Sequence, residues 1–235
     1  MTINNKDIPK FYDGFNAESF KKFGINIRHR TIFKNLKTAG LLPSHNVLEI
    51  GCGTGPVTSL IAKYCNKGKI VAADISPESI KYAENYLKRF SNIHFLVSDM
   101  SDFKYEMKFD FIVLPDVLEH IPLEQHRNLF YTIRQHCHIN SIVFINIPAP
   151  HYLRWMYKYK PELIQIIDQP LSMQDLLNDV YPNGFYLFSS GIYNLAINEG
   201  DYQQIILKPD KNMETVTYKS KKELIIQEIK SKLFY

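Results

Sequence analysis

The chain has 235 residues, of which 45% are hydrophobic and 13% aromatic. These proportions exclude a disordered chain, and the length favours one domain with at most a small appendage. The formal net charge of +4 at pH 7 is too small and too dispersed to indicate a nucleic-acid partner.

The three cysteines, Cys52, Cys65 and Cys137, are scattered and form no C-x-x-C pair. An odd, scattered set predicts neither a disulfide framework nor a zinc site, so no metal is expected. The first residues lack the apolar run of a signal peptide. No stretch approaches the roughly 20 apolar residues that a membrane span requires. We therefore expect a cytoplasmic protein with no membrane span.

The first expected elements are two helices, at residues 15–23 and 25–41. They belong to an N-terminal cap, residues 1–44, that is expected to lie over the sheet. From residue 45 to 147, short β-rich runs alternate with longer helical patterns. The expected strands are 47–50, 69–73, 93–97, 109–114 and 141–147, and the expected helices are 58–64, 76–89 and 124–136. Strands separated by helices predict right-handed βαβ units and a parallel sheet that is covered on both faces.

After residue 147 the pattern changes. Pro148 and Pro150 end the fifth strand, and an aromatic-rich, partly helical insertion is expected at about 149–182, with a helix capped by Ser172. Residues 185–196 and 202–207 are predicted to be a terminal pair of strands that completes the domain at 208. The segment 209–235 is expected to be a polar linker followed by an amphipathic helix at 219–234.

The most informative segment is the turn after the first strand. Glu49 lies in that strand, and glycines follow at positions 51, 53 and 55. Such glycines allow positive φ and a close approach of the backbone to a ligand, and α/β sheets bind nucleotides at the carboxyl ends of their strands. The alternative is a tight strand-to-helix turn without a ligand. Pro56 occupies the position where a dinucleotide fingerprint needs glycine, and no Gly-Lys-Ser/Thr sequence follows, so a nucleoside without phosphates is indicated.

Residues 49–55, Glu-Ile-Gly-Cys-Gly-Thr-Gly, resemble the first motif of the class I S-adenosylmethionine-dependent methyltransferases of the small-molecule type. The later motifs follow in the family's order, with Asp74 at the end of the second strand, Asp99-Met100 after the third and residues 109–120 around the fourth. The resemblance covers residues 45–147 clearly and the terminal strand pair loosely. It implies a doubly wound, mostly parallel, seven-stranded Rossmann-like α/β fold with an antiparallel C-terminal pair.

The resemblance also implies roles in binding S-adenosylmethionine. Glu49 would orient the glycine loop or the cofactor's amino group, and Asp74 would bind the ribose hydroxyls. Asp99 would accept a hydrogen bond from the adenine amine, with Met100 and Ile75 against the ring. Arg28 and Arg30 could reach the carboxylate from the N-terminal helix, and the alternative for both is a solvated helix face. The expected cofactor-binding residues are Glu49, Gly51, Cys52, Gly53, Asp74, Ile75, Asp99, Met100, Pro115 and Arg28.

A general base near the methyl acceptor would speed transfer to a hydroxyl or a protonated amine. His120 is the first candidate, because it follows the fourth strand and histidine titrates near neutral pH. The alternative is a structural histidine whose ring bonds to backbone. Weaker candidates are Asp116, Glu119, His29 and His151. The acceptor pocket is expected between the N-terminal cap and the insertion, with the lining residues Tyr12, Phe15, His29, His151, Tyr152 and Trp155.

The predicted function is methyl transfer from S-adenosylmethionine to an O, N or C atom of a small, planar or apolar molecule, with S-adenosylhomocysteine as product. A protein or peptide methyltransferase and a non-catalytic binding module remain alternatives. A nucleic-acid methyltransferase is disfavoured, since residues 114–117 lack the Asn/Asp-Pro-Pro-aromatic signature. The C-terminal helix is open to three interpretations: packing on its own domain, packing on a second subunit in a homodimer, or binding to a membrane surface.

Overall fold

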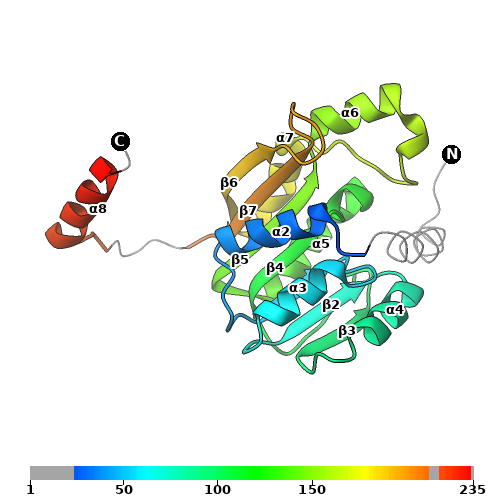
Figure 1. Ribbon diagram of the computed structural model, residues 1–235, viewed down its shortest axis with the longest axis horizontal. Coiled ribbons are helices and arrows are strands. Elements are labelled where there is room, and N and C mark those ends of the chain that lie inside the picture. The colour runs from blue at the N-terminus through cyan, green and yellow to red at the C-terminus, as the bar shows by residue number, and fades with distance from the viewer. Residues whose placement is uncertain (1–23, 212–216, 234–235) are drawn as a thin grey trace.

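The computed structural model describes residues 24–211 and 217–233. Within these residues, seven strands form one sheet in the order β3-β2-β1-β4-β5-β7-β6 (Figure 1). The strands are β1 (Val47–Ile50), β2 (Ile70–Asp74), β3 (Ile93–Val97), β4 (Phe109–Pro115), β5 (Cys137–Pro148), β6 (Phe185–Tyr193) and β7 (Tyr202–Pro209). The first five are parallel, and β7 runs antiparallel to both β5 and β6. The doubly wound fold with its antiparallel C-terminal pair is therefore confirmed.

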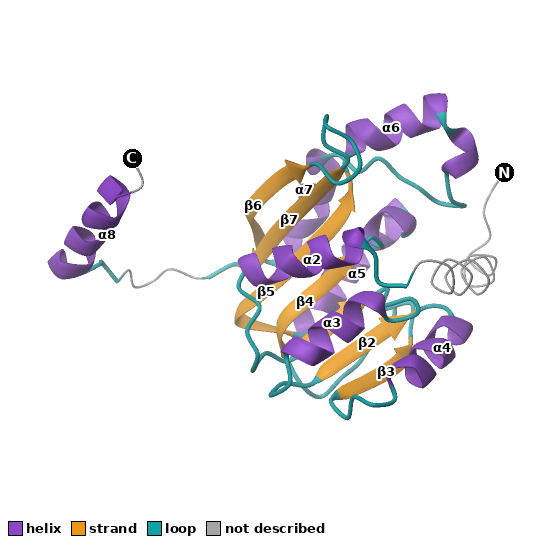
Figure 2. Cartoon of the chain, in the orientation of Figure 1, coloured by secondary structure: helices purple, strands orange, loops and turns teal. Residues whose placement is uncertain are grey.

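Helices cover both faces of the sheet (Figure 2). The helices are α2 (Ile27–Thr38), α3 (Pro56–Tyr64), α4 (Pro77–Leu87), α5 (Leu123–Gln135), α6 (Pro150–Tyr159), α7 (Met173–Val180) and α8 (Lys221–Leu233). On one face, apolar residues of α2, α3 and α4 pack against the sheet, and on the other face those of α5 and α7 do so. The result is a three-layer α/β/α arrangement.

The central strands are buried along their whole length, as parallel strands covered on both faces must be. Side chains alternate between the faces, so Val47 packs towards α2 and α3 while Leu48 and Ile50 pack towards α5. Glu49 shares the side of Val47. This parity places its carboxyl group on the face that α2 and α3 cover, near Thr58 of α3.

The cap helix α2 is shorter than the predicted 25–41. It begins after Asn26, whose side chain and backbone exchange hydrogen bonds with His29 in a capping box. The expected helix at 15–23, and with it Tyr12 and Phe15, lies outside the described residues.

Two strand boundaries differ from the sequence prediction by three residues or more. β5 begins at Cys137 rather than at 141, because Cys137 pairs with Phe109 before a register shift in β4. β6 ends at Tyr193 rather than at 196, since the backbone N–H groups of Leu195 and Ala196 instead donate to the carboxylate of Asp201. The Asp201 side chain thus accepts from the backbone N–H groups that a longer β6 would have used for strand pairing.

The C-terminal helix α8 lies apart from the sheet and its helices (Figure 1). Every one of its residues is exposed, including Leu224, Ile225 and Ile229. In this structure α8 therefore does not pack on its own domain, which was one of the three interpretations. Among the described residues, none of the helices has the length and apolar character that crossing a membrane demands.

Candidate active site

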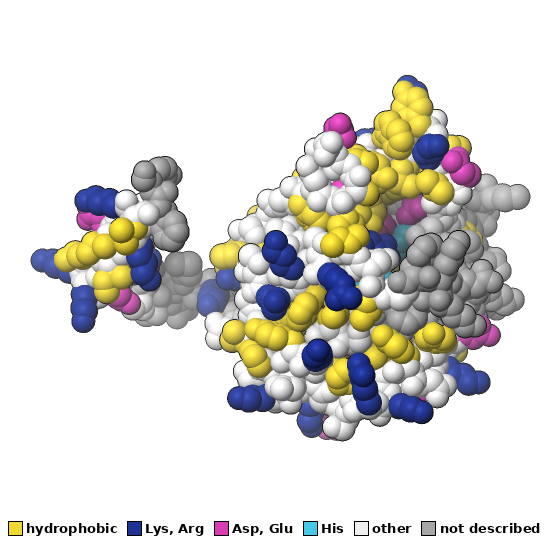
Figure 3. Space-filling view, in the orientation of Figure 1, with side chains coloured by type: hydrophobic (Ala, Val, Ile, Leu, Met, Phe, Trp, Pro, Cys, Tyr) yellow, Lys and Arg dark blue, Asp and Glu magenta, His cyan; other side chains and the backbone are white. Residues whose placement is uncertain are grey.

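A cavity of about 620 Å³ opens at the carboxyl ends of β1, β2 and β4. The order of strands reverses between β1 and β4, which is where doubly wound sheets bind ligands. Residues of α2, α6 and the loop after α6 complete the wall. Acidic and histidine side chains are visible inside this hollow, within a rim that is largely hydrophobic (Figure 3).

The glycine turn forms the floor of the cavity. Gly51, Gly53 and Gly55 all have positive φ, at 75°, 52° and 87°. A Cβ atom on Gly51 would lie 2.5 Å from Cγ2 of Val117, so this position requires glycine for space as well as for backbone conformation. Gly51, Cys52 and Gly53 line the cavity, and the structure thereby brings together the turn residues expected from the sequence.

Glu49 lines the same cavity although its side chain is completely buried. Neither of its carboxyl oxygens has a hydrogen-bond partner within the described part of the chain. Burial raises the pKa of Glu49 from its ordinary value of 4.5 to about 8; the nearby Thr58 hydroxyl opposes the rise, and the carboxylate of Asp74 adds to it. A buried carboxyl group without partners is costly, and a cationic donor from a ligand would satisfy it.

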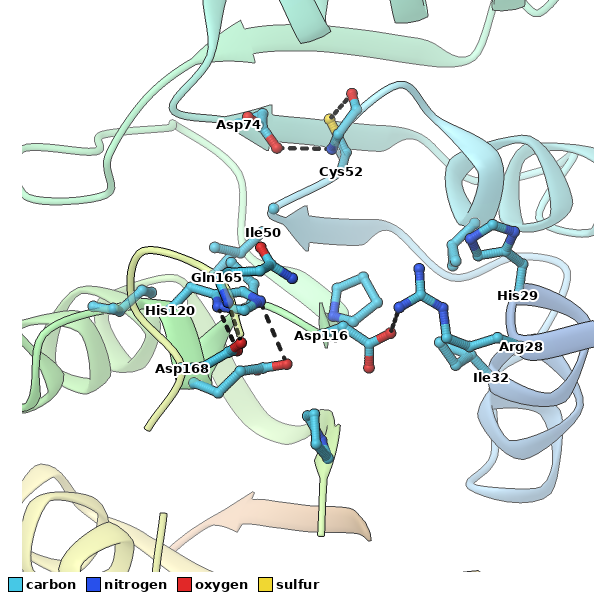
Figure 4. Close-up of a pocket in the computed structure, with 18 of the residues that line it drawn as sticks. Arg28, His29, Ile32, Ile50, Cys52, Asp74, Asp116, His120, Gln165 and Asp168 are labelled. Atoms are coloured by element: carbon cyan, nitrogen blue, oxygen red, sulfur yellow. Dashed lines mark hydrogen bonds and ion pairs between the residues drawn. The ribbon is translucent and has the colours of Figure 1, made fainter. Parts of the chain in front are cut away.

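Asp74 connects the end of β2 to the glycine turn. Its Oδ2 accepts a hydrogen bond of 2.7 Å from the Gly53 N–H, and its Oδ1 accepts one of 2.9 Å from the Ser76 N–H. Figure 4 shows Asp74 beside Cys52 in this arrangement. The carboxylate is therefore held in place and also lines the cavity together with Ile75.

Asp99, Met100 and Pro115 line the cavity too. Met100 has a φ of 67°, rare for a residue other than glycine, and its N–H donates to the Ser98 hydroxyl. Met100 is buried, whereas Asp99 is exposed and accepts hydrogen bonds from the backbone and hydroxyl of Ser101. One apolar side chain beside one carboxylate suits a flat ring with an exocyclic donor.

Arg28 reaches the end of β4 from α2. Its guanidinium lies 3.0 Å from Oδ2 of Asp116, as Figure 4 shows, and it also hydrogen-bonds Tyr202. Asp116 has a φ of 55°, and its Oδ1 accepts from the buried amide of Asn146 at 2.6 Å. The Asn146 amide oxygen in turn accepts from the Tyr193 hydroxyl at 2.8 Å. Arg28 is thus a cavity residue with a structural partner, not part of a solvated helix face.

His120 lies at the end of the short 3-10 turn Leu118–His120 and lines the cavity. Its Nδ1 is 2.5 Å from the carbonyl oxygen of Ile167 and 3.2 Å from Oδ1 of Asp168. A carbonyl can only accept, so Nδ1 carries the proton and the lone pair of the neutral ring is on Nε2. Burial lowers the pKa of His120, while Ile167, Asp168 and Asp116 oppose the change.

Glu119 precedes His120 and is 1% exposed. Its Oε1 lies 3.7 Å from Nε2 of His120, and its Oε2 has no partner among the described residues. Burial raises the pKa of Glu119 well above its ordinary range. The Glu-His pair therefore has both features that the two sequence interpretations expected: a backbone-bonded ring and a position on the cavity wall.

The remaining acceptor candidates divide into two groups. Tyr152 and His29 line the cavity, but His151 and Trp155 are not among its described lining residues. His151 contacts the carbonyl of Glu199, and Trp155 stacks on Tyr152 while 46% exposed. Burial and Arg28 lower the pKa of His29 to about 4, and its Nδ1 accepts from the Asn26 N–H, which makes it a capping residue rather than a base.

Several cavity or support residues had no motif in the sequence. Gln165 and Asp168 come from a loop without periodicity. This loop is held beside the 3-10 turn Leu118–His120, because Gln169 donates to the carbonyls of Glu119 and Ile121. Asn146 did leave a signal, as the lone polar side chain in the middle of an otherwise apolar predicted strand, and a buried amide of that kind needs partners.

This geometry defines a doubly wound α/β protein with a nucleoside-sized cavity at its topological switch point. Residues 47–139 match the family model described as a methyltransferase domain. Residues 47–139 are thus similar to a methyltransferase domain, as the resemblance of the motifs predicted.

Curated relatives match a part of the chain. Nodulation protein S from Sinorhizobium fredii is 33% identical over 79 residues, which are 34% of this chain and 36% of that protein. Malonyl-[acyl-carrier protein] O-methyltransferase 1 from Ilyobacter polytropus is 37% identical over 96 residues, which are 41% of this chain and 36% of that protein. The chain thus spans about a third of the length of these relatives.

Solved structures share the fold over most of the chain. The magnesium protoporphyrin IX methyltransferase of Synechocystis PCC 6803, solved with bound SAH, has a TM-score of 0.66 at 16% identity and covers 87% of this chain and 99% of its own. The N-methyltransferase NodS of Bradyrhizobium japonicum WM9, in complex with S-adenosylhomocysteine, has a TM-score of 0.66 at 16% identity and covers 88% and 98%.

Proposed function

We propose that this protein transfers a methyl group from S-adenosylmethionine to a small molecule. The observation that carries the proposal is Glu49, a fully buried carboxyl group with both oxygens unpaired, on the wall of a cavity formed by the glycine turn. The family of residues 47–139 and the presence of S-adenosylhomocysteine or S-adenosylmethionine in structures of the same fold support the same ligand.

The cavity residues match the parts of this cofactor. In the proposal, Glu49 takes its ammonium group, Asp74 its ribose hydroxyls, and Asp99 with Met100 its adenine, while Gly51 and Gly53 let the backbone approach closely. Arg28 has five N–H donors, so its pairing with Asp116 leaves donors for the cofactor's carboxylate.

The cofactor supplies an activated methyl group on a sulfonium sulfur. The protein's residues must hold the acceptor in line with that methyl and keep water out. His120 is proposed to take a proton from the acceptor at Nε2, because the Ile167 carbonyl fixes the proton of the neutral ring on Nδ1. Tyr152, Leu153 and Met156 of α6 contribute the less polar wall. A volume of about 620 Å³ lies in the range of small-molecule sites.

The proposal is tested by calorimetric titration of the protein with S-adenosylhomocysteine. Asp74→Ala should weaken binding by about 1.5–3 kcal/mol, since charge-assisted hydrogen bonds are lost. Asp74→Asn keeps an acceptor oxygen for the Gly53 N–H, so the glycine turn should stay intact. Weaker binding by this variant would then report the lost ligand contact and not a changed turn. Asp102→Ala, at an exposed position outside the cavity, is the matched control. Absence of binding by folded wild-type protein would refute the proposal.

The proposal includes a cytoplasmic location, no nucleic-acid partner and self-association through α8. The three cysteines are free and buried, which suits a reducing compartment. The exposed apolar residues of α8 would be covered in a homodimer. Sedimentation of the full chain against a chain truncated after residue 211 tests the last point, because a monomer in both cases excludes it.

A further inference from the structure

The cavity is acidic although the chain as a whole is basic. Arg28 is the single Lys or Arg on its wall among the described residues, and its charge is offset by Asp116 at 3.0 Å. The formal net charge of the whole chain is +4, so the acidity is a local property. Seven acidic residues line the wall: Glu49, Asp74, Asp99, Asp116, Glu119, Asp168 and Asp201.

The acidic residues divide according to position. Glu49 in β1, Asp74 at the end of β2 and Asp99 after β3 lie where the cofactor would bind. Two more carboxylates are already engaged: Asp116 with Arg28 and Asn146, and Asp201 with backbone N–H groups. Glu119 and Asp168 remain, on either side of His120.

Two hydrogen-bond acceptors on this part of the wall lack a donor in the described chain. They are Oε2 of Glu119 and Oε1 of Gln165, both inaccessible to solvent. Asp168 links Gln165 to the histidine. The backbone N–H of Gln165 donates to Oδ2 of Asp168 at 2.7 Å, and Oδ1 of Asp168 lies 3.2 Å from Nδ1 of His120. Buried acceptors without donors are costly, and a ligand that brings N–H groups would satisfy both.

We propose that the methyl acceptor is an amine, with its nitrogen bound by Glu119 and Gln165 beside His120. This inference rests on the proposed function and names the substrate class of that site. The neutral amine lone pair forms the new N–C bond, the C–S bond breaks with its electron pair going to sulfur, and the sulfonium becomes a thioether. Nε2 of His120 takes the proton that the ammonium form of the amine loses before attack, and the product leaves as the methylated ammonium.

Other acceptor classes fit these residues less well. A carboxylate acceptor would need a cation of its own, and Arg28, the single Lys or Arg on the described wall, is already paired with Asp116 and assigned to the cofactor's carboxylate. A phenolate or alkoxide would meet the carboxylate of Asp168, beside His120, with a like charge. An amine arrives as a cation attracted by the wall, and the positive sulfonium nearby then favours its loss of a proton.

The experiment measures S-adenosylhomocysteine formation, and the mass of the methylated product, with phenethylamine, hexylamine and 1,6-diaminohexane. Each amine is run beside the alcohol and the carboxylic acid of the same carbon skeleton. We expect rates with amines at least about tenfold above those of their matched partners, which is the discrimination from roughly one buried hydrogen bond. A higher rate with an alcohol or carboxylic acid overturns the inference.

Variants localise the effect to the proposed residues. Glu119→Gln should lower kcat/KM for the amine by about tenfold or more, while S-adenosylhomocysteine affinity stays within about twofold. Gln165→Ala should act in the same direction, and Glu162→Gln, exposed on the same insertion, is the control. If the protein binds S-adenosylhomocysteine but methylates none of the amines, this inference fails alone. If it binds no S-adenosylhomocysteine, the proposed function itself fails.

Discussion

Substitution of Glu49 by glutamine should stabilise the protein and at the same time weaken its binding of the cofactor. Glutamine keeps the shape of the side chain but cannot ionise. Burial raises the pKa of Glu49 from 4.5 to about 8, so the folded wild-type chain pays a cost at neutral pH that the variant avoids. Stability and cofactor binding are expected to change in opposite directions, because the carboxyl group of Glu49 binds a cationic ligand but destabilises the protein without one.

The sign and size follow from proton linkage. Between pH 4.5 and about 8 the folded chain holds a proton on Glu49 that the unfolded chain has released, so the Glu49 contribution to stability falls as pH rises. Each pH unit in that window is worth about 1.4 kcal/mol. From about pH 5.5 to about pH 7.5 the wild-type chain should therefore lose up to about 3 kcal/mol that Glu49→Gln retains.

The assay is urea unfolding of both proteins at the two pH values, with Glu84→Gln on the exposed side of α4 as the control. At each pH, the free energy of unfolding of wild type is subtracted from that of Glu49→Gln. The quantity compared is the change in this difference between the two pH values. Calorimetry with S-adenosylmethionine should show affinity reduced by about ten- to a hundredfold in Glu49→Gln. The reasoning is refuted if Glu49→Gln is less stable than wild type at the higher pH, or binds the cofactor equally well.

Further predictions concern the turn and the histidine. Gly51→Ala should lower the free energy of unfolding by about 2–4 kcal/mol, because the new methyl group would meet Val117 and φ is positive; a loss below about 1 kcal/mol in urea unfolding would contradict the contact. His120→Ala should reduce turnover of an amine acceptor by about 10²–10⁴ with cofactor affinity nearly intact, whereas wild-type turnover would indicate a structural histidine. Asp168→Asn removes a charge that raises the pKa of His120, so the acidic limb of the kcat/KM profile should move to lower pH, and an unmoved limb would exclude Asp168 as a positioning residue.

The part of the fold that the sequence predicted is the part built by local patterns. The largely apolar runs at 47–50 and 93–97 recur as β1 and β3 with the same bounds, β1 as a fully buried strand and β3 as a partly buried edge strand. Ser76 caps α4 and Pro77 begins it, as expected from their local preferences. The strand ends at Cys137 and Tyr193 were missed because they depend on pairing partners distant in sequence.

The sequence by itself determined the order of strands and helices and the glycine turn that needs residues without side chains. It also marked Glu49, Asp74 and His120, because motif spacing is a local property of the chain. Only the tertiary structure decided the partners of these residues: Asp116 against Arg28, and Ile167 and Asp168 against His120. Burial and pairing arise between segments that are far apart along the chain, so charge and proton position at the site follow from packing rather than from any motif.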